Sequence, residues 1–337
     1  MKIAKLELLN ILKKLKPAVG SSNNSSISNA DCFVFNEDTI VTFNEEIAII
    51  YPLVTGIKCA VPADELMKFV TRAKGKDVII EHEESKINLT SGKSKAVLII
   101  PKVDNTIHDA IDTLEIPSKF LKLPENFAEG LRLCSHSFSK DITDVHLCGI
   151  NVVGNKMQSS DDFRISEFTM DSEVKKPFLL FGKHAEALQN YNVLKYYKTE
   201  VWLYFLLDDD TVFCSRIMIG NEYPEVDQYF DFKGKNVVLP KDLCESVDVA
   251  AITSTDNDKA FGEITVKIAD GVITCTGKNN KGESWKASKI DFEGSVEFAI
   301  NPEFLNKILK VTSKLRVGKD RCLFDADGFR QLFSLKK

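Results

Sequence analysis

The chain has 337 residues, of which 44% are hydrophobic and 28% are charged, and its formal net charge is −5. This length suggests two or three domains that each bury a core, and the sequence has no apolar run near the ~18 residues of a membrane-spanning helix. The net acidity argues against a protein that wraps nucleic acid tightly.

The first third of the chain predicts two amphipathic helices that each lead into a hairpin. Residues 6–19 place apolar side chains at helical spacing, and residues 60–70 contain the second such helix. The polar stretch at residues 20–29 is expected to be a loop within this domain. A hairpin turn is expected at residues 36–38, and strands are expected at residues 78–82 and 97–101.

The middle third repeats this plan. Helices are expected at residues 124–131 and 181–188, and the first of them opens with a proline in its first turn. Turn signals follow at residues 154–156 and 208–210. The strands on either side of the second turn are expected at residues 201–207 and 212–219.

The last third shows the plan again. Helices are expected at residues 240–247 and 300–309. The hairpin turns are expected at residues 269–271 and 325–328, and the final strands at residues 321–324 and 329–335.

The block therefore occurs three times, and its second helix opens near residues 60, 181 and 300. A spacing of roughly 120 residues is that of a small domain, because solenoid repeats have only about 20–50 residues. We predict an α+β fold of three repeated domains, each with two helices packed on antiparallel sheets. The predicted domains are residues 1–116, 117–235 and 236–337.

The eight cysteines are scattered along the chain, and none belongs to a CxxC motif. Several fall in strand or helix patterns, where cysteine packs as a small hydrophobic side chain. We see no signal peptide at the N-terminus. This pattern indicates a reducing compartment, and we predict a cytoplasmic protein.

Two short motifs could have indicated nucleotide or metal chemistry. Residues 91–94, Ser-Gly-Lys-Ser, are similar to part of a phosphate-binding loop. The first glycine of that loop is replaced by Ile87, and residues 96–100 predict a strand where the loop needs a helix. The aspartates at residues 208–210 lie at a predicted hairpin tip, where a solvated turn is the simpler interpretation.

Cys134, His136, His146 and Cys148 have the residue types of a zinc site. Cys134 and His136 are two positions apart on a predicted helix, so they should point away from each other, and zinc stays a minor alternative. No GxSxG or HExxH motif is present. We therefore predict a scaffold or binding protein with no catalytic activity, no cofactor and no metal.

Several segments, in order along the whole chain, resemble the bacterial replicative DNA sliding clamp, the β subunit of DNA polymerase III. They are residues 61–63 with 91–95, residues 147–150 with 160–165, residues 215–225 and residues 297–305. The resemblance implies three clamp-fold domains that form half of a head-to-tail homodimeric ring. Helices would line the central hole, and sheets would form the outer shell.

The resemblance also implies a processivity factor that encircles duplex DNA, without reading its sequence, and tethers the replicative polymerase. The implied partners are double-stranded DNA, the replicative DNA polymerase, a clamp loader and a second copy of the chain, all at the nucleoid. Weak phosphate contacts from inner helices suit a protein that slides. The positions carried over as DNA contacts are Lys13, Lys14, Arg72, Lys74, Arg132, Lys140, His146 and Lys183.

Clamps of this family bind partner peptides in an apolar pocket between the middle and third domains. The matching positions here are Leu147, Ser160, Asp162, Phe163, Arg164, Ile165, Pro224, Tyr229, Asn301, Phe304, Leu332, Phe333 and Leu335. Asp162 and Phe163 replace smaller or more flexible residues, so we expect a narrower and more acidic pocket. These changes and the altered C-terminal tail are consistent with a divergent or phage-encoded clamp.

The family's dimer interface pairs a basic edge of the first domain with an acidic edge of the third. Lys93 and Lys95 keep the basic side, whereas the strand expected at residues 283–291 carries lysines beside Glu283. The predicted interface residues are Phe69, Ala73, Lys93, Lys95, Ala96, Leu98, Ile252, Thr253 and Glu283.

The altered edge leaves an alternative open. A diverged clamp-fold protein could bind clamp partners as a monomer without encircling DNA. An enzyme with an unrecognised site is the remaining class, and a bound metal or nucleotide would distinguish it. Ring formation separates the first two hypotheses.

Overall fold

The computed structural model describes residues 1–21, 26–101, 105–161, 163–218, 222–254 and 262–335. Within these residues the chain repeats one motif six times, a strand and a helix followed by three strands. Two successive motifs make one domain, so the element order is that of three related domains. The three-domain α+β fold with antiparallel sheets, predicted from the sequence, is confirmed.

The first domain contains motifs β1 to β4 and β5 to β8. Their elements are β1 (Lys2–Ala4), α1 (Lys5–Leu15), β2 (Cys32–Asn36), β3 (Thr39–Phe43) and β4 (Ile47–Pro52), then β5 (Lys58–Pro62), α2 (Ala63–Arg72), β6 (Asp77–Glu83), β7 (Lys86–Ser91) and β8 (Ser94–Ile99). A further helix, α3 (Asn105–Asp112), precedes the second domain.

The second domain contains motifs β9 to β12 and β13 to β16. Their elements are β9 (Leu121–Lys122), α4 (Phe127–Cys134), β10 (Gly149–Val153), β11 (Lys156–Ser160) and β12 (Arg164–Thr169), then β13 (Phe178–Phe181), α5 (Gly182–Leu188), β14 (Val193–Lys198), β15 (Trp202–Leu207) and β16 (Val212–Arg216).

The third domain follows a short 3₁₀-helix, η3 (Asp227–Phe230). Its elements are β17 (Lys235–Val238), α6 (Leu243–Ala251), β18 (Ile264–Ala269), β19 (Val272–Asn279) and β20 (Gly282–Lys289), then β21 (Val296–Ile300), α7 (Pro302–Leu309), β22 (Lys314–Val317), β23 (Arg321–Ala326) and β24 (Phe329–Ser334).

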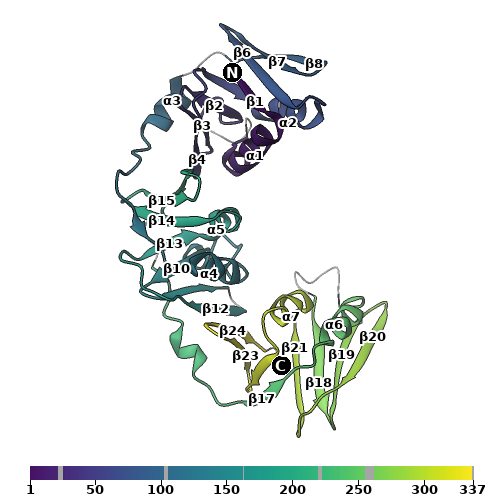
Figure 1. Cartoon of the computed structure of the whole chain (residues 1–337). Helices are drawn as coiled ribbons and strands as arrows, with labels where there is room; N and C mark the ends of the chain where they lie inside the picture. The colour runs from purple at the N-terminus through teal and green to yellow at the C-terminus, as the bar shows by residue number, and fades with distance from the viewer. Residues whose placement is uncertain (22–25, 102–104, 162, 219–221, 255–261, 336–337) are drawn as a thin grey trace. The chain divides into compact units, whose positions relative to one another are not determined.

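The chain forms two compact units. The first consists of Met1–Ala128 and Val174–Gly220, and the second of Glu129–Glu173 and Asn221–Lys337. In the first unit, one antiparallel sheet has the order β5-β2-β3-β4-β16-β15-β14-β9, and a second has the order β1-β6-β7-β8. Helices α1 and α2 lie side by side (Figure 1), and α1 turns Leu8, Leu12 and Leu15 into the core.

The second unit has the same construction. Strands β10-β11-β12-β24-β23-β22-β17 follow one another in one antiparallel sheet, and β20-β19-β18-β21 form another. Helices α6 and α7 lie next to each other, and α6 packs on β19 and β20 (Figure 1). In each unit a long sheet therefore joins strands from two different domains, through β4 and β16 in the first and through β12 and β24 in the second.

The predicted helices are present, but the sequence interpretation was wrong in three places. The first helix was expected to reach residue 19, whereas α1 ends at Leu15 and a 3₁₀ turn follows, because Pro17 has no N–H to continue the helix. His136 was placed on a helix that in fact ends at Cys134. The strand expected at residues 212–219 ends at Arg216.

Other elements were not predicted at all. The sequence indicated a two-stranded hairpin after the helix of each motif. In the structure each motif also has a short strand before its helix, and three strands instead of two after it. Helix α3 was also missed, and its Ile107 and Ile111 are buried in the core of the first unit.

Candidate partner-binding site

A cavity of about 440 Å³ opens on the second unit beside the β12–β24 junction. Its walls come from β12, β24, η3 and the loops around them. The lining residues are His146, Leu147, Ser160, Asp161, Phe163, Arg164, Ile165, Pro224, Glu225, Val226, Tyr229, Asp320, Arg321, Leu332, Ser334 and Leu335. We call this space the larger cavity.

The floor of the larger cavity is apolar because two neighbouring strands present branched side chains there. Ile165 on β12 lies directly opposite Leu332 on β24. Both belong to a buried cluster with Val226 and Phe230 from the η3 segment and with Leu323 from β23. The cavity wall is thus continuous with a packed core, which holds the shape of the site in the free protein.

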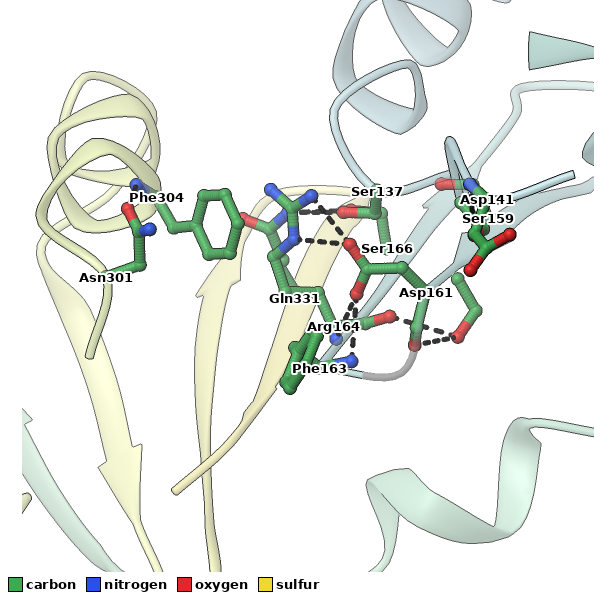
Figure 2. A network of polar contacts seen from close by, with 12 residues as sticks. Ser137, Asp141, Ser159, Asp161, Phe163, Arg164, Ser166, Asn301, Phe304 and Gln331 are labelled. Atoms are coloured by element: carbon green, nitrogen blue, oxygen red, sulfur yellow. Dashed lines mark hydrogen bonds and ion pairs between the residues drawn. The ribbon is translucent and has the colours of Figure 1, made fainter. Parts of the chain in front are cut away.

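Arg164 closes one side of the larger cavity. Its guanidinium forms a two-point ion pair with Asp161, with N–O distances of 2.7 and 3.1 Å, and is 3.5 Å from the centre of the Phe304 ring (Figure 2). Only 8% of Arg164 is exposed. A buried arginine is tolerated when it is paired with a carboxylate and stacked on an aromatic face, and this one has both.

A smaller hollow of about 40 Å³ adjoins the larger cavity, and Phe163 and Ser334 line both. Its other walls include Asn301, Phe304 and Phe333. Asn301 caps α7, because its side-chain oxygen accepts hydrogen bonds from the backbone N–H groups of Glu303 (2.8 Å) and Phe304 (3.3 Å). The cap fixes the start of α7 and so places the Phe304 ring.

Buried hydroxyl and amide groups support the strands behind the site. Gln331 on β24 donates to the hydroxyls of Ser137 (2.8 Å) and Ser166 (2.9 Å), which are themselves 2.7 Å apart (Figure 2). All three side chains are buried. Since buried polar groups are costly without partners, this closed set favours a single register of β12 on β24.

The structure brings most of the predicted pocket residues together. Those lining the larger cavity are Leu147, Ser160, Phe163, Arg164, Ile165, Pro224, Tyr229, Leu332 and Leu335. Asn301, Phe304 and Phe333 line the smaller hollow, and Asp162 lies outside the described residues.

Sequence reasoning missed several lining residues, including Asp161, Val226, Asp320, Arg321 and Ser334. Asp161 and Val226 lie within or next to the matched segments. Asp320, Arg321 and Ser334 lie on or beside β23 and β24, and the pairing of these strands brings them to the cavity. His146, predicted to contact DNA, also lines the larger cavity.

The residues predicted to contact DNA occur on helices or next to them. Lys13 lies on α1, Arg72 ends α2, Arg132 is on α4 and Lys183 is on α5, and all four are exposed. Lys74 and Lys140 are exposed in loops.

Lys14 is different from this set. It forms an ion pair with Asp209 at the tip of the β15–β16 hairpin, and it lies 6.0 Å from the centre of the Tyr51 ring. Its side chain is only 25% exposed. Asp209 therefore offsets the charge of Lys14, and this lysine has less to offer a phosphate group than Lys13.

The predicted dimer residues lie at or near β8 and β20, which are the last strands of the two four-stranded sheets. Ala96 and Leu98 are half-buried on β8, while Lys93, Lys95 and Glu283 are exposed. Phe69 on α2 and Thr253 after α6 are half-buried, Ala73 is buried, and Ile252 is 71% exposed.

The exposed faces of these two strands also carry apolar side chains that sequence reasoning missed. Val97 and Ile99 on β8 are 59% and 75% exposed, and Trp285 on β20 is 63% exposed. On both strands these side chains alternate with half-buried residues, because alternate side chains on a strand lie on opposite faces of the sheet. Their spacing of two residues is the signal by which the sequence could have placed them on one face.

The candidate zinc residues do not form a group in the part of the chain that the structure describes. The Cys134 thiol donates to the Met157 carbonyl (3.4 Å), and the Cys148 thiol donates to the Asp141 carbonyl (3.1 Å). Burial raises the pKa of the Cys134 thiol, which disfavours the thiolate that zinc requires. All eight cysteines are free thiols.

Among the described residues, no helix is long and apolar enough to cross a membrane. No protein-family model matches the sequence, and no curated protein matches it.

Solved structures do match, over the full chain. A DNA polymerase III beta subunit from Thermotoga maritima has 17% identity and a TM-score of 0.81, covering 100% of this chain and 98% of its own. The DNA polymerase sliding clamp from Bacillus subtilis has 17% identity and a TM-score of 0.79, with coverage of 100% and 98%. The Helicobacter pylori beta clamp bound to a DNA ligase peptide has 14% identity and a TM-score of 0.78, with both chains covered completely.

The chain therefore has the fold of the bacterial DNA polymerase III beta sliding clamp. The resemblance seen in the sequence is confirmed at the level of structure.

Proposed function

We propose that this protein is a DNA sliding clamp, a homodimeric ring that encircles duplex DNA and tethers a replicative polymerase. The observation that carries the proposal is the pattern of strand pairing between motifs. In one unit, β4 ends its motif and pairs with β16, which ends another. In the other unit, β12 and β24 have the same relation.

The third pair in this series is β20 with β8. Each of these strands also ends its motif, but each lies at the edge of a four-stranded sheet. A second copy of the chain supplies the missing neighbour for both, through β8 against β20 of the partner at one joint and the reverse at the other. A head-to-tail dimer that closes in this way leaves neither edge exposed to further pairing.

Four exposed basic side chains support the DNA-binding part of the proposal. They are Lys13, Arg72, Arg132 and Lys183. They lie on helices of the first two domains, in a chain of net charge −5. Few and exposed cations give weak, sequence-independent and salt-sensitive phosphate contacts, which suit a protein held on DNA by enclosure.

The larger cavity and the smaller hollow support the binding of partner peptides. A structurally similar clamp from Helicobacter pylori was solved with a DNA ligase peptide. For this chain we propose that apolar and aromatic side chains of polymerase and loader segments occupy the two spaces. The proposed site of action is the cytoplasm, at the nucleoid.

A monomeric clamp-fold protein is the second candidate, and the charges of the edge strands favour it. β8 and its turn carry Lys95 and Lys93, and β20 carries Lys289 and an exposed Glu283. Glu283 is the one acid on β20 that can offset the lysines of β8, so apolar contacts must supply most of the affinity.

Solution mass distinguishes the two candidates. For a chain of 37.8 kDa, the clamp proposal expects a concentration-dependent species of twice that mass in sedimentation equilibrium. A chain that stays monomeric at about 50 μM, where interfaces of standard size are occupied, would overturn the ring and leave the monomeric candidate.

A further inference from the structure

Beside the larger cavity, on the same face of the sheet as Ile165 and Leu332, three polar side chains stand in a row across adjacent strands. Gln158 on β11 lies opposite Glu167 on β12, and Glu167 lies opposite Arg330 on β24. Gln158 donates to Glu167 Oε2 (2.7 Å), and Arg330 donates to Glu167 Oε1 (2.7 Å). Only 3% of Glu167 is exposed, so this carboxylate depends on its partners.

Asp227, the first residue of η3, makes a hydrogen bond and an ion pair with β11, from the segment between β16 and β17. Its Oδ1 accepts from Gln158 Nε2 (2.7 Å), and its Oδ2 pairs with Lys156 Nζ (2.6 Å). Lys156 also lies 3.7 Å from Glu167. The two carboxylates thus share the same two donors, and the charges of Lys156, Glu167, Asp227 and Arg330 sum to zero.

The far end of η3 is held as well. The Arg330 guanidinium lies 4.0 Å from the centre of the Phe230 ring, and Arg321 donates to the Tyr229 carbonyl (3.3 Å). Val226 and Tyr229, on either side of Asp227, both line the larger cavity, whereas Asp227 does not. A four-residue 3₁₀-helix has little stability of its own, so these contacts decide where the cavity wall stands.

We propose that Asp227 is a positioning residue, which sets the wall of the larger cavity by fixing η3 on the row of Gln158, Glu167 and Arg330. The inference rests on the proposed peptide-binding function of that cavity. Without Asp227, Glu167 keeps Arg330, Lys156 and Gln158, so the fold survives while the wall loosens. Binding of a ligand must then order Val226 and Tyr229, and the free energy that this ordering costs lowers the affinity.

The first test uses a fluorescein-labelled peptide Gln-Leu-Phe-Ser-Leu, which copies residues 331–335 of this chain and carries the apolar and aromatic side chains proposed for the ligand. Asp227→Asn should weaken its binding about three- to tenfold with little change in Tm. Lys156→Met should have a similar effect, and the double variant should add little, because both act on one contact. In a Tyr229→Ala background the effect of Asp227→Asn should shrink. Asp231→Asn, an exposed acid just after η3, is the matched control.

Hydrogen–deuterium exchange of the free protein gives a readout that needs no ligand. Asp227→Asn should speed exchange at residues 225–230 and leave β11 and β12 unchanged, and Asp227→Glu should restore part of the protection. Unchanged exchange at η3 overturns the inference, as does unchanged affinity in a wild-type background that binds the peptide. If the wild type does not bind, the peptide-binding function fails, while the exchange data still decide the role of Asp227.

Discussion

Arg164 shows how single side chains connect the parts of the candidate site. Its ion pair with Asp161 holds the turn before β12, and its face covers Phe304 on α7. The sequence motif predicted Arg164 as a pocket residue, but its partner Asp161 was not predicted. A two-point pair and a stacking contact both need the planar guanidinium, so lysine cannot replace this arginine.

At this scale we predict that Phe304 and Leu335 anchor the bound peptide from opposite parts of the site. Phe304 lines the smaller hollow, and Leu335 lines the larger cavity. The double variant Phe304→Ala, Leu335→Ala should lose about 2 kcal/mol or more of peptide binding, because buried apolar anchors carry most of the energy in such interfaces. Titration of the labelled peptide measures the loss. Wild-type affinity in the double variant would place the partner site elsewhere.

A second prediction concerns Glu46, whose Oε2 lies 3.5 Å from His184 Nε2. The hydrogen bond from His184 lowers the pKa of Glu46 below its usual 4.5. A carboxyl group with a lowered pKa in the folded state stabilises the fold at any pH above its usual pKa. This contribution is lost as the pH falls towards and below the lowered pKa. Urea unfolding between about pH 5 and pH 3 should therefore show a steeper loss for the wild type than for Glu46→Gln. Parallel curves would mean that the contact has no influence on folding.

Among the secondary-structure elements, β8 and β20 matter most because they are sheet edges that keep exposed apolar side chains. Val97, Ile99 and Trp285 point to the face opposite the half-buried residues of their strands. Exposed apolar strands invite association, and natural proteins usually protect such edges. Here the proposed dimer gives the protection.

We predict that a charge at either edge shifts the protein to monomer. Val97→Asp on β8 and Ile252→Asp after α6 should each raise the dimer dissociation constant at least about tenfold, because each places a carboxylate in an apolar contact. Sedimentation equilibrium measures the shift. Val54→Asp is the matched control, since Val54 is 85% exposed in the loop between β4 and β5 and belongs to neither edge strand. If both edge variants dimerise like the wild type, another surface forms the dimer.

At the scale of the whole molecule, one motif used six times provides the sheets and most of the helices of the described chain. Each motif contributes a helix with one buried face and strands that continue a neighbouring sheet. The basic side chains that we propose as DNA contacts are few and exposed. Enclosure by the ring, and not affinity, would then retain the protein on DNA.

We therefore predict that the protein, after incubation with a bacterial clamp loader and ATP, stays on circular DNA and leaves linear DNA. Lys13→Glu with Lys183→Glu should weaken loading, more strongly at low salt, because exposed phosphate contacts are screened as salt rises. Lys14→Glu should have an additional effect on folding, since it would face Asp209. Lys195→Glu on β14 is the exposed control. Equal retention on both DNA forms would indicate ordinary binding.

The sequence by itself determined the number of domains, the class of the fold and the helix of each repeated motif, although it did not indicate α3. Helical periodicity and turn residues are local signals, and a threefold repetition makes them reliable. Its motifs also indicated most residues of the candidate pocket, including Ile165, Phe304 and Leu332, because those positions belong to matched segments.

Only the tertiary structure decided which strands meet and which charges are paired. The junctions at β4–β16 and β12–β24 join segments more than 150 residues apart, and no local pattern encodes such pairings. The same distance in sequence separates Lys14 from Asp209 and Glu167 from Arg330. A lysine that reads as an exposed DNA contact can thus be an ion-paired one, and an isolated Asp227 can hold a cavity wall, because the fold supplies partners that neighbours in the sequence do not.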